Sequence, residues 1–509
     1  MISKKILLRA ISVCTIISSI MICHDMTIAN APSQGVHEKK KVGTVVLPRQ
    51  IKMVGISKQG SAKSSITNRV GKKETNKRLF LHESSTSSEP LTKSIRSSNH
   101  EKVLKNYANL TPITKSSIDK KDTTPYIRVL LREQCQQIAI MSRARIVVGN
   151  DKGTTVDTFL PAMVRVPIMV KNNNIVVDKK VYGPMISVRS ISANEAISID
   201  GQEYRGSISF IATGPNSMTM INHVPLEEYL YGVVPQEAIP SWPMSALEAQ
   251  AVAARTYAIY TMNNNKNKLY DIRPTTKNQV YGGKSGEYTN TTRAVDATRG
   301  VIIRYNGRPI NALFHSDSGG YTENSENVWG TNLPYLQGVK DENQSAPTAT
   351  WLVSISKKQL EEKLYHAGKS VGTLHSIQLS PLVAPPIYTI DRGVSGRIKS
   401  AVFIGSKGHV TISGDALMAI LGLKSTLFDF YINHKPTTMS LDRKQEKIYH
   451  TFTKNNDMIY IKGHGSGHGV GLSQWGAAEM AKRATHEDVN FYKTILRHYY
   501  TGVSIDTIY

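Results

Sequence analysis

One acidic residue, Glu237, is expected in a turn just before a helix, in a short apolar stretch whose composition suits acid–base chemistry. Its apolar neighbours are Val233, Val234, Pro235, Ala238, Ile239 and Trp242. Such surroundings disfavour the carboxylate anion and raise the pKa of the acid, as a group that protonates a glycosidic oxygen requires. The alternative is a carboxylate in a turn near a helix N-terminus, which is common and mildly stabilising. The residue types by themselves favour this alternative.

Two further clusters combine glycines with polar side chains. Residues 315–324 read HSDSGGYTEN, and residues 463–476 read GHGSGHGVGLSQWG. Glycines let the backbone approach a ligand closely, and Ser318 and Asn324 suit hydrogen bonds to sugar hydroxyls and N-acetyl groups. His464 and His468 are four apart in a glycine loop rather than on a helix, so a metal pair is disfavoured. They line a sugar cleft or stabilise the loop.

Two other activities are excluded for these clusters. Residues 317–320 read DSGG, like the nucleophile motif of chymotrypsin-like proteases. The upstream Ala-Ala-His motif and the usual disulfides are missing, so we reject that activity. The loop 463–471 lies between an expected strand and helix, where a phosphate could bind, but it lacks the Gly-Lys-Ser/Thr ending of a phosphate-binding loop.

The elements that must position these residues are of mixed type. Residues 125–222 show short apolar alternations separated by turn signals, which indicates strands. A helix is expected from Met244 to Thr261, with a core face that includes Leu247 and Ala254. A hairpin of Val301–Tyr305 and Pro309–Phe314 is expected to turn at Asn306-Gly307, and a second hairpin is expected at Lys407-Gly408. A further helix follows Ser473. We therefore predict an α+β fold, strand-rich, with a cleft beside the helix that follows Glu237.

The N-terminus has the features of an export signal. Lys4, Lys5 and Arg9 precede an apolar run at 10–23 that is short for a membrane span, and Ala29-Asn30-Ala31 is a small-x-small cleavage site. Pro32 disfavours cleavage there, so the segment could instead remain as an N-terminal anchor. In either case the protein is expected to be exported to the periplasm or cell envelope, or secreted.

Residues 32–124 are expected to form a disordered basic linker. They hold 19 Lys and Arg against 7 Asp and Glu, a charge of +12 (19 − 7), half of the chain's +24. The linker either attracts anionic wall polymers or lipid headgroups, or is a solvated spacer. The basic charge occurs without an RNP, helix-turn-helix or zinc-finger pattern, so no nucleic-acid partner is expected. Cys135 alone lies outside the signal, so no internal disulfide is expected, and Cys135 is a core residue.

The three clusters together resemble the stage II sporulation protein D family, which includes the amidase enhancers of bacterial cell walls. The matching sequences are VPLEEYL and GVV within 224–234, AVAARTYA at 251–258, the 315–324 cluster and the glycine loop. This resemblance covers about Pro225 to residue 509, with a weaker match from 125. It divides the chain into a signal or anchor (1–31), the linker (32–124), a β-rich part (125–222) and a catalytic core (223–509).

The resemblance implies a lytic transglycosylase acting on peptidoglycan glycan strands stripped of stem peptides. Glu237 occupies the position of the family's catalytic acid, which acts first as acid and then as base. The residues expected to contact substrate are Arg255, Tyr257, Gln279, Tyr281, His315, Ser318, Tyr321, Glu323, Asn324, His464, His468 and Gln474. For Arg255 a buried salt bridge is an equal alternative, and Glu227 or Glu228 is expected to pair with a cation.

Two rival functions remain open at this point. A non-catalytic wall protein that stimulates an amidase is one, and an amidase would then be its partner. The other is a muramidase that uses water and needs a second carboxylate, for which Glu323 is the best candidate. No cofactor is expected. Several family members bind zinc between the ARTYA helix and a QVY sequence, but residues 271–283 here contain neither Cys nor His, so no structural zinc is predicted.

Overall fold

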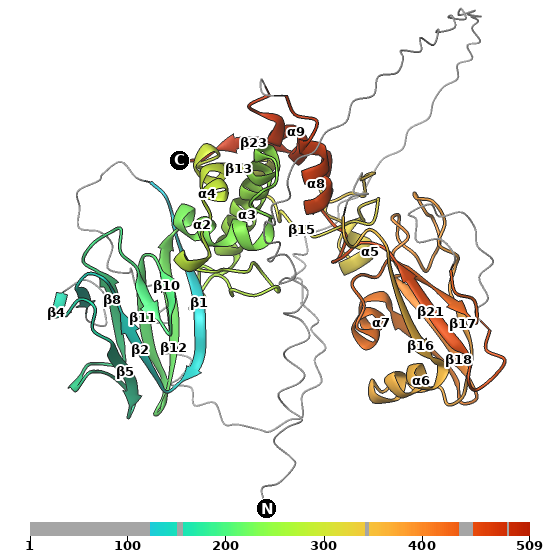
Figure 1. Ribbon diagram of the computed structural model, residues 1–509, viewed down its shortest axis with the longest axis horizontal. Coiled ribbons are helices and arrows are strands. Elements are labelled where there is room, and N and C mark those ends of the chain that lie inside the picture. The colour runs from blue at the N-terminus through green and yellow to red at the C-terminus, as the bar shows by residue number, and fades with distance from the viewer. Residues whose placement is uncertain (1–122, 150–155, 342–345, 437–450, 486–487) are drawn as a thin grey trace, which may run out of the picture. The chain divides into compact units, whose positions relative to one another are not determined.

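The computed structural model describes residues 123–149, 156–341, 346–436, 451–485 and 488–509 (Figure 1). The predicted export signal and nearly all of the predicted basic linker lie outside these residues. The described chain is a mixture of helices and strands, which confirms the predicted α+β class. No helix within the described residues is both long and apolar enough to cross a membrane.

The strands from residue 126 to 225 form two six-stranded sheets. One sheet has the order β1-β12-β11-β8-β3-β4 and the other β10-β9-β2-β5-β6-β7, and their neighbouring strands are antiparallel. The bounds are β1 (Tyr126–Cys135), β2 (Gln137–Met141), β3 (Ile146–Gly149), β4 (Val156–Leu160), β5 (Val166–Lys171), β6 (Asn174–Val177), β7 (Lys180–Val181), β8 (Met185–Ser190), β9 (Ile197–Ile199), β10 (Gln202–Tyr204), β11 (Ser207–Gly214) and β12 (Ser217–Pro225).

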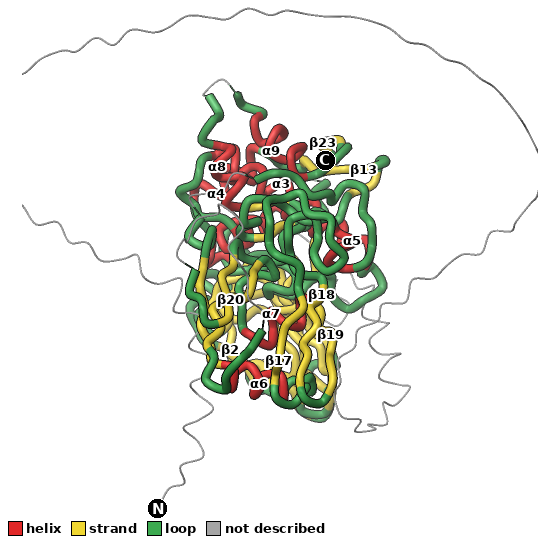
Figure 2. Tube along the Cα trace, turned by 90° about the vertical axis from the view of Figure 1, so that its right-hand side faces the viewer, coloured by secondary structure: helices red, strands yellow, loops and turns green. Residues whose placement is uncertain are grey.

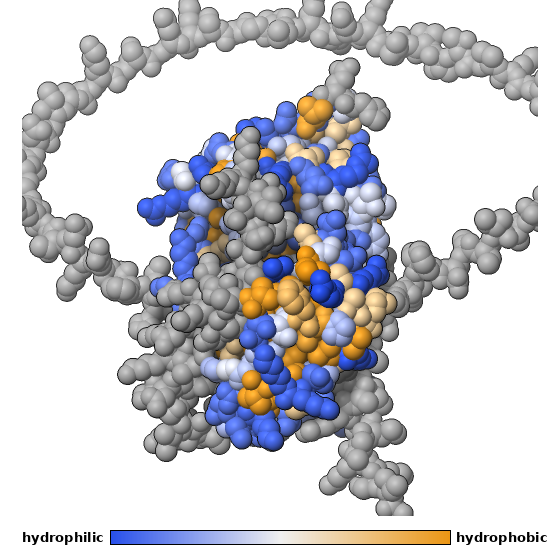
Figure 3. Space-filling view, turned by 90° about the vertical axis from the view of Figure 1, so that its left-hand side faces the viewer, coloured by the Kyte–Doolittle hydropathy of each residue, from blue (hydrophilic) through white to orange (hydrophobic). Residues whose placement is uncertain are grey.

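Residues from both sheets contribute to one apolar core. In β5, Val166, Ile168 and Val170 are buried while the residues between them are partly exposed, because successive strand residues face opposite sides. Cys135 is a buried free thiol in this core, as expected. Figure 3 shows apolar area on one face of the molecule, and the exposed apolar side chains of this strand-rich part include Phe159 and Met163.

Two helices follow directly and carry the first sequence cluster. Helix α2 spans Leu226–Glu237 and α3 spans Met244–Asn264, three residues beyond the predicted end. The alanines at 249, 251, 253, 254 and 258 have no exposed surface, so α3 packs closely on its neighbours. The short turn η1 (Lys284–Gly286) and helix α4 (Thr289–Ala297) complete this group. Helix α3 lies between α2 on one side and two later helices, α8 (Gln474–Ala481) and α9 (Phe491–Tyr499), on the other.

A small sheet and one short strand pair connect distant parts of the chain. Strand β13 (Val301–Tyr305) pairs with β14 (Arg308–Pro309) and β23 (Ser504–Thr507). The predicted hairpin at Asn306-Gly307 is present but ends at Pro309. Strand β15 (Phe314–His315) instead pairs in parallel with β22 (Leu472–Ser473), directly before α8. This pair places the second and third sequence clusters beside each other, followed in the chain by helix α5 (Ser325–Trp329) and α8 respectively.

Residues 351–463 build a separate apolar core from two three-stranded sheets and two helices. The sheets have the orders β16-β21-β20 and β17-β18-β19, and Figure 2 shows the second with β18 between β17 and β19. The bounds are β16 (Trp351–Ser356), α6 (Lys357–His366), β17 (Leu374–Gln378), β18 (Ser400–Gly405), β19 (Gly408–Ser413), α7 (Gly414–Leu421), β20 (Phe428–Ile432) and β21 (Met458–Gly463). The predicted hairpin at Lys407-Gly408 and the helix after it are confirmed.

Candidate active site

Glu237 is the last residue of α2 rather than part of a separate turn, which corrects the prediction. Gly232 and Pro235 gave the stretch the character of a turn. Packing overrides these signals, because Leu226, Tyr229, Leu230, Val233 and Val234 follow helical spacing and are all fully buried. Gly232 suits this close packing, since a side chain there would reach within 2.6 Å of the Gly283 carbonyl oxygen.

The Glu237 carboxyl group is half-buried and has few hydrogen-bond donors. Burial raises the pKa of Glu237, and two groups that favour the anion lower it in part: the Val280 N–H, 3.0 Å from Oε1, and the side chain of Gln474. The residue also stands at the negative end of the α2 dipole, which further disfavours the anion. Within the described residues, no charged side chain contributes to this pKa shift. The geometry therefore gives an acid that holds its proton more tightly than a free glutamate.

The backbone donor of Val280 is fixed by its neighbour Gln279. The Gln279 side chain accepts a hydrogen bond from the Tyr229 hydroxyl at 3.1 Å and donates one to the Ala254 carbonyl at 3.1 Å. It has no exposed surface, so its role is to hold the loop, and the predicted substrate contact is corrected. Tyr281 is likewise buried and donates to Asn222 at 3.0 Å. Gln279 and Tyr281 therefore fix the backbone of Val280, which donates to Glu237.

Aromatic side chains stand beside the acid. Trp242 and Trp475 meet edge to face with ring centroids 5.2 Å apart, and both are half-buried. Trp475 directly follows Gln474, so this pair and the Gln474 side chain tie the start of α8 to the region of Glu237. Half-buried aromatic rings suit the apolar faces of sugars. Tyr257, also half-buried, accepts a hydrogen bond from Asn278 at 3.0 Å. The sequence reasoning missed Trp475, although it lies within the glycine-rich motif.

Arg255 forms the salt bridge that was the alternative to substrate contact. Its Nε and Nη2 atoms each lie 2.7 Å from one oxygen of Glu227, and the two side chains are 0% and 2% exposed. This confirms that one glutamate of the VPLEEYL run pairs with a cation. A side chain without exposed surface cannot touch a glycan, so Arg255 is a structural residue that joins α2 to α3.

His315, His468 and Trp329 form a second group at the glycine loop. The ring centroids of His315 and His468 are 5.4 Å apart, and those of His468 and Trp329 are 5.1 Å apart. Trp329 is 48% exposed and His468 is half-buried, so this group reaches the surface. Burial and the charge of Arg397 lower the pKa of His468 to about 4. Its Nδ1 accepts the Val470 N–H at 3.1 Å, so the ring is neutral with its proton on Nε2.

His315 is buried and neutral as well. Burial, followed by the charge of Arg397, holds its pKa well below the usual range. Its Nδ1 donates to the Val470 carbonyl at 3.1 Å, which leaves the Nε2 lone pair without a hydrogen-bond partner among the residues that the structure describes. His315 belongs to β15, and Gln474 directly follows its partner strand β22, so the histidine group and the Glu237 region are neighbours in the fold. Among the described residues, no direct hydrogen bond joins Glu237 to a histidine.

The remaining predicted residues mostly hold the loops together. Ser318 has no exposed surface and donates to Asp341 at 2.6 Å, and His464 is 2% exposed with its Nδ1 3.0 Å from the Ala349 carbonyl. Asn324 is half-buried and accepts the Gly338 N–H, and Tyr321 is half-buried where its backbone bridges to Lys340. The predicted substrate contact of Ser318 is therefore corrected to a structural role.

Glu323, the candidate second carboxylate, is fully buried. Its oxygens accept hydrogen bonds from Asn327, Val394 and Ser395, at 2.6–3.1 Å. Every one of these donors is internal to the protein, so this carboxylate is not available to activate water. The prediction that Glu323 contacts substrate is corrected on the same ground.

No group of three or more His, Cys, Asp or Glu side chains in the described chain could hold a metal ion. The stretch from 271 to 283 instead makes polar contacts of its own, for example Asp271 with Arg128 at 2.7 Å. The absence of zinc stays a prediction.

Sequence comparisons connect this chain with known proteins. The family model described as Stage II sporulation protein matches residues 215–305. An uncharacterized protein of Brachyspira hyodysenteriae is 35% identical over 347 residues, which cover 68% of this chain and 84% of that protein. Stage II sporulation protein D of Bacillus amyloliquefaciens is 32% identical over 306 residues, 56% of this chain and 75% of the relative. The amidase enhancer of Bacillus subtilis is 30% identical over 349 residues, but these span only 47% of its length.

Proposed function

The chain belongs to the stage II sporulation protein D family, and on this premise we propose that it binds and cleaves peptidoglycan glycan strands as a lytic transglycosylase. The observation that carries the proposal is the environment of Glu237. It is a single carboxyl group with a raised pKa that accepts the Val280 N–H. The Gln474 side chain lowers this pKa in part, and Trp242 and Trp475 pack on each other in the adjoining segments. We propose that the protein acts outside the cytoplasm, as its first 31 residues suggest.

One carboxyl group suffices for this reaction. Protonated Glu237 donates its proton to the glycosidic oxygen as the bond to the muramic acid C1 breaks. The resulting carboxylate then accepts the proton of the C6 hydroxyl, which attacks C1 and closes a 1,6-anhydro ring. The Val280 N–H and Gln474 stabilise the carboxylate between the two steps, and burial returns it to the acid form. A hydrolase with two carboxylates needs a partner acid roughly 5–9.5 Å away, and the internal hydrogen bonds of Glu323 argue against that scheme.

The test is digestion of purified denuded glycan by wild type and by Glu237→Gln, with mass analysis of the products. We expect 1,6-anhydro ends from the wild type and a loss of about 10²–10⁴-fold in the variant, the usual contribution of a general acid. Glu248→Gln is a matched control. Glu248 is a half-buried acid of α3 whose pKa burial raises to about 7, but it lies by Tyr492 rather than Gln474.

Three results would overturn the assignment. Glu237→Gln that retains more than about a hundredth of wild-type cleavage removes Glu237 from the chemistry. Loss of cleavage in Glu248→Gln alone would move the acid to α3. Reducing ends in place of anhydro ends would indicate attack by water.

The same samples address the amidase-enhancing alternative, which rests on the name of the Bacillus subtilis relative. Both wild type and Glu237→Gln are added to a purified N-acetylmuramoyl-L-alanine amidase acting on intact wall. Equal stimulation by the two proteins, with no anhydro product from either, would replace the enzymatic proposal by a binding role. Stimulation that depends on Glu237 would instead make glycan cleavage the cause of the effect.

A further inference from the structure

One buried arginine connects both loops of the histidine group. Arg397 is 2% exposed; its Nη1 donates to the Gly467 carbonyl at 2.9 Å and its Nη2 to the Ser318 carbonyl at 3.1 Å. Gly467 belongs to the glycine loop and Ser318 to the 315–324 cluster. A single guanidinium therefore fixes the relative position of two segments that are far apart in the sequence.

The glycine loop also packs directly on this side chain. Gly469 has φ +86°, and a Cβ atom there would lie 2.0 Å from Arg397 Nε. Only glycine combines this backbone conformation with such a close approach. Gly469 stands next to His468, so the contact with Arg397 sets the backbone that carries the imidazole.

Glu323 holds the residues that come just before Arg397 in the chain. The Glu323 carboxylate accepts the N–H groups of Val394 and Ser395 at 2.9 and 3.1 Å and the Ser395 hydroxyl at 2.6 Å. The Glu323 N–H donates to the Gly469 carbonyl at 2.8 Å. The Glu323 carboxylate also accepts a hydrogen bond from the Asn327 side chain of α5, the helix that ends at Trp329. The carboxylate thus binds the segment, the glycine loop and the tryptophan helix.

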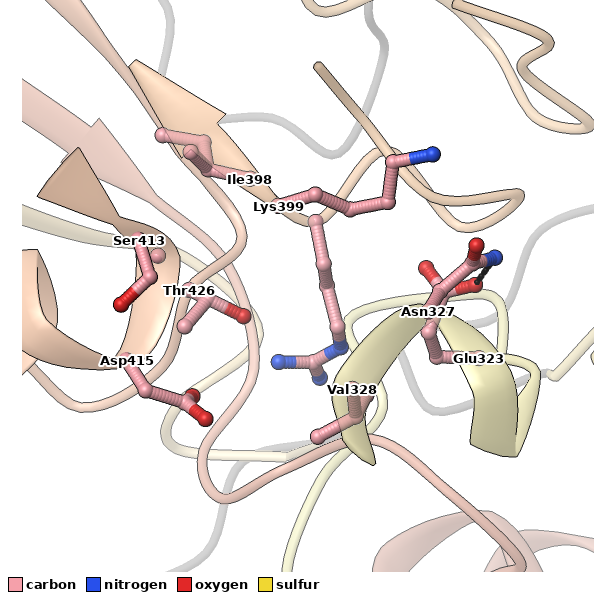
Figure 4. Close-up of a pocket in the computed structure, with 10 residues that line it drawn as sticks. Glu323, Asn327, Val328, Ile398, Lys399, Ser413, Asp415 and Thr426 are labelled. Carbon is pink, nitrogen blue, oxygen red and sulfur yellow. Dashed lines mark hydrogen bonds between the residues drawn. The ribbon is translucent and has the colours of Figure 1, made fainter. Parts of the chain in front are cut away.

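Packing alone does not hold Arg397 in place. A surface pocket lies beside it, with Asn327 and Val328 of α5 facing Ser413 and Asp415 at the start of α7 (Figure 4). In the described residues no carboxylate oxygen is within ion-pair distance of Arg397, and burial lowers the pKa of its guanidinium to about 10, so it remains charged at neutral pH. A buried cation is costly unless it is hydrogen-bonded or lies near opposite charges. The two carbonyl groups and the charges of Glu323, Asp317 and Asp415 therefore stabilise it.

We propose that residues 391–397 form a latch, with Arg397 as a positioning residue that holds His468 and Trp329, whose ring centroids are 5.1 Å apart, together as one surface for a sugar ring. The inference rests on the proposed function for its substrate, a glycan of N-acetylated sugars. Arg397 does not touch this substrate. Arg397 positions His468 through the glycine loop, whereas Glu323 positions Trp329 through α5 and also binds the latch.

The test uses the full chain with Arg397→Met, Arg397→Lys and Gly469→Ala. Lysine keeps the charge but cannot bridge two carbonyls as the planar guanidinium does. Gly469→Ala disturbs the same contact from the loop side, so the test does not depend on one variant that fails to fold. Lys399→Met removes a charge at the same pocket, and Phe403→Leu weakens the core of residues 351–463 without reaching the glycine loop.

Two readouts separate positioning from general stability. The first is the affinity for denuded glycan, where we expect the three test variants to bind about 10- to 100-fold more weakly, as after loss of a buried charged hydrogen bond, with KM changed more than kcat. The second is the 15N NMR spectrum of the His468 imidazole without ligand, which should shift in the test variants. Both controls should leave affinity within about twofold and the imidazole unchanged.

Equal affinity losses in Arg397→Met and Phe403→Leu would overturn the latch, as would an unchanged His468 spectrum in all three test variants. Wild-type protein that neither binds nor cleaves glycan would instead refute the proposed function. The imidazole spectra still decide the latch in that case, because they need no substrate.

Discussion

Replacement of Arg255 by methionine should destabilise the protein strongly. The guanidinium makes two bonds of 2.7 Å to Glu227, and it also donates to the carbonyls of Val295 and Val301 at 3.1 and 3.2 Å. Without it, the buried Glu227 carboxylate retains the Gly300 N–H at 3.4 Å and the Tyr509 hydroxyl. Two charge-assisted bonds contribute about 1.5–3 kcal/mol each, and breaking a buried pair on one side costs about 3–5 kcal/mol. We expect the free energy of unfolding to fall by about 3–5 kcal/mol.

Urea unfolding followed by circular dichroism measures this loss. The matched control is Arg273→Met, because Arg273 pairs with Glu133 at 3.0 Å but both side chains are more than 40% exposed (42% and 44%). That change should cost at most about 1 kcal/mol. The double change Arg255→Met with Glu227→Leu should recover part of the loss, since no unpaired buried charge remains. A cost of Arg255→Met no larger than that of Arg273→Met would refute the reasoning.

Three further predictions follow from the structure and the sequence. Gln474→Leu removes a group that lowers the pKa of Glu237, so that pKa should rise and the acid form should persist to higher pH. The alkaline limb of the pH–rate profile for glycan cleavage should move to higher pH, and a shift to lower pH would contradict the assignment. Deletion of residues 32–122 should weaken wall association at low salt, where charges are least screened; the deletion stops before Thr124 because Arg299 donates a hydrogen bond to the Thr124 hydroxyl. Turnover of short soluble glycans should stay unchanged, and loss of that turnover would show that the segment is part of the fold. Purified protein should contain no stoichiometric zinc and should keep its activity in a chelator, whereas about one zinc per chain by elemental analysis would overturn the zinc prediction.

Local signals in the sequence predicted those elements whose geometry is set locally. The turn at Asn306-Gly307 is one case, because both residues adopt positive φ, 48° and 75°, as a tight hairpin requires. Ala251, Ala254 and Ala258 repeat on one face of α3 and are buried as their spacing indicates. Glu237 was identified as the candidate acid from the family resemblance, because its apolar neighbours by themselves favoured a structural role. Its place at the end of α2 was not predicted.

Contacts between distant residues decided the points that the sequence left open or misassigned. Arg255 could face substrate or a carboxylate, and only the fold brings Glu227 against it. Phe314 leaves the predicted hairpin because it pairs with Leu472. Glu323 looked available for catalysis because nothing near it in the sequence reveals the Val394 and Ser395 donors. Polar residues in a motif can thus be essential to a site without touching the ligand, and motif spacing does not separate the two roles.

The short β15–β22 pair has a consequence for the order in which a new chain acquires activity. His315 reaches its place only when Ser473 is present to pair with it, and Glu237 meets the Gln474 side chain only through the helix that follows. Strand pairing over such a long sequence separation is slow, because the intervening chain must first be closed into a loop. The helix that ends at Glu237 can therefore form early during synthesis, whereas a competent acid is assembled only after residue 474 has been made. Under the proposed function, the chain therefore gains glycan cleavage only after the part that carries Gln474 has been synthesised.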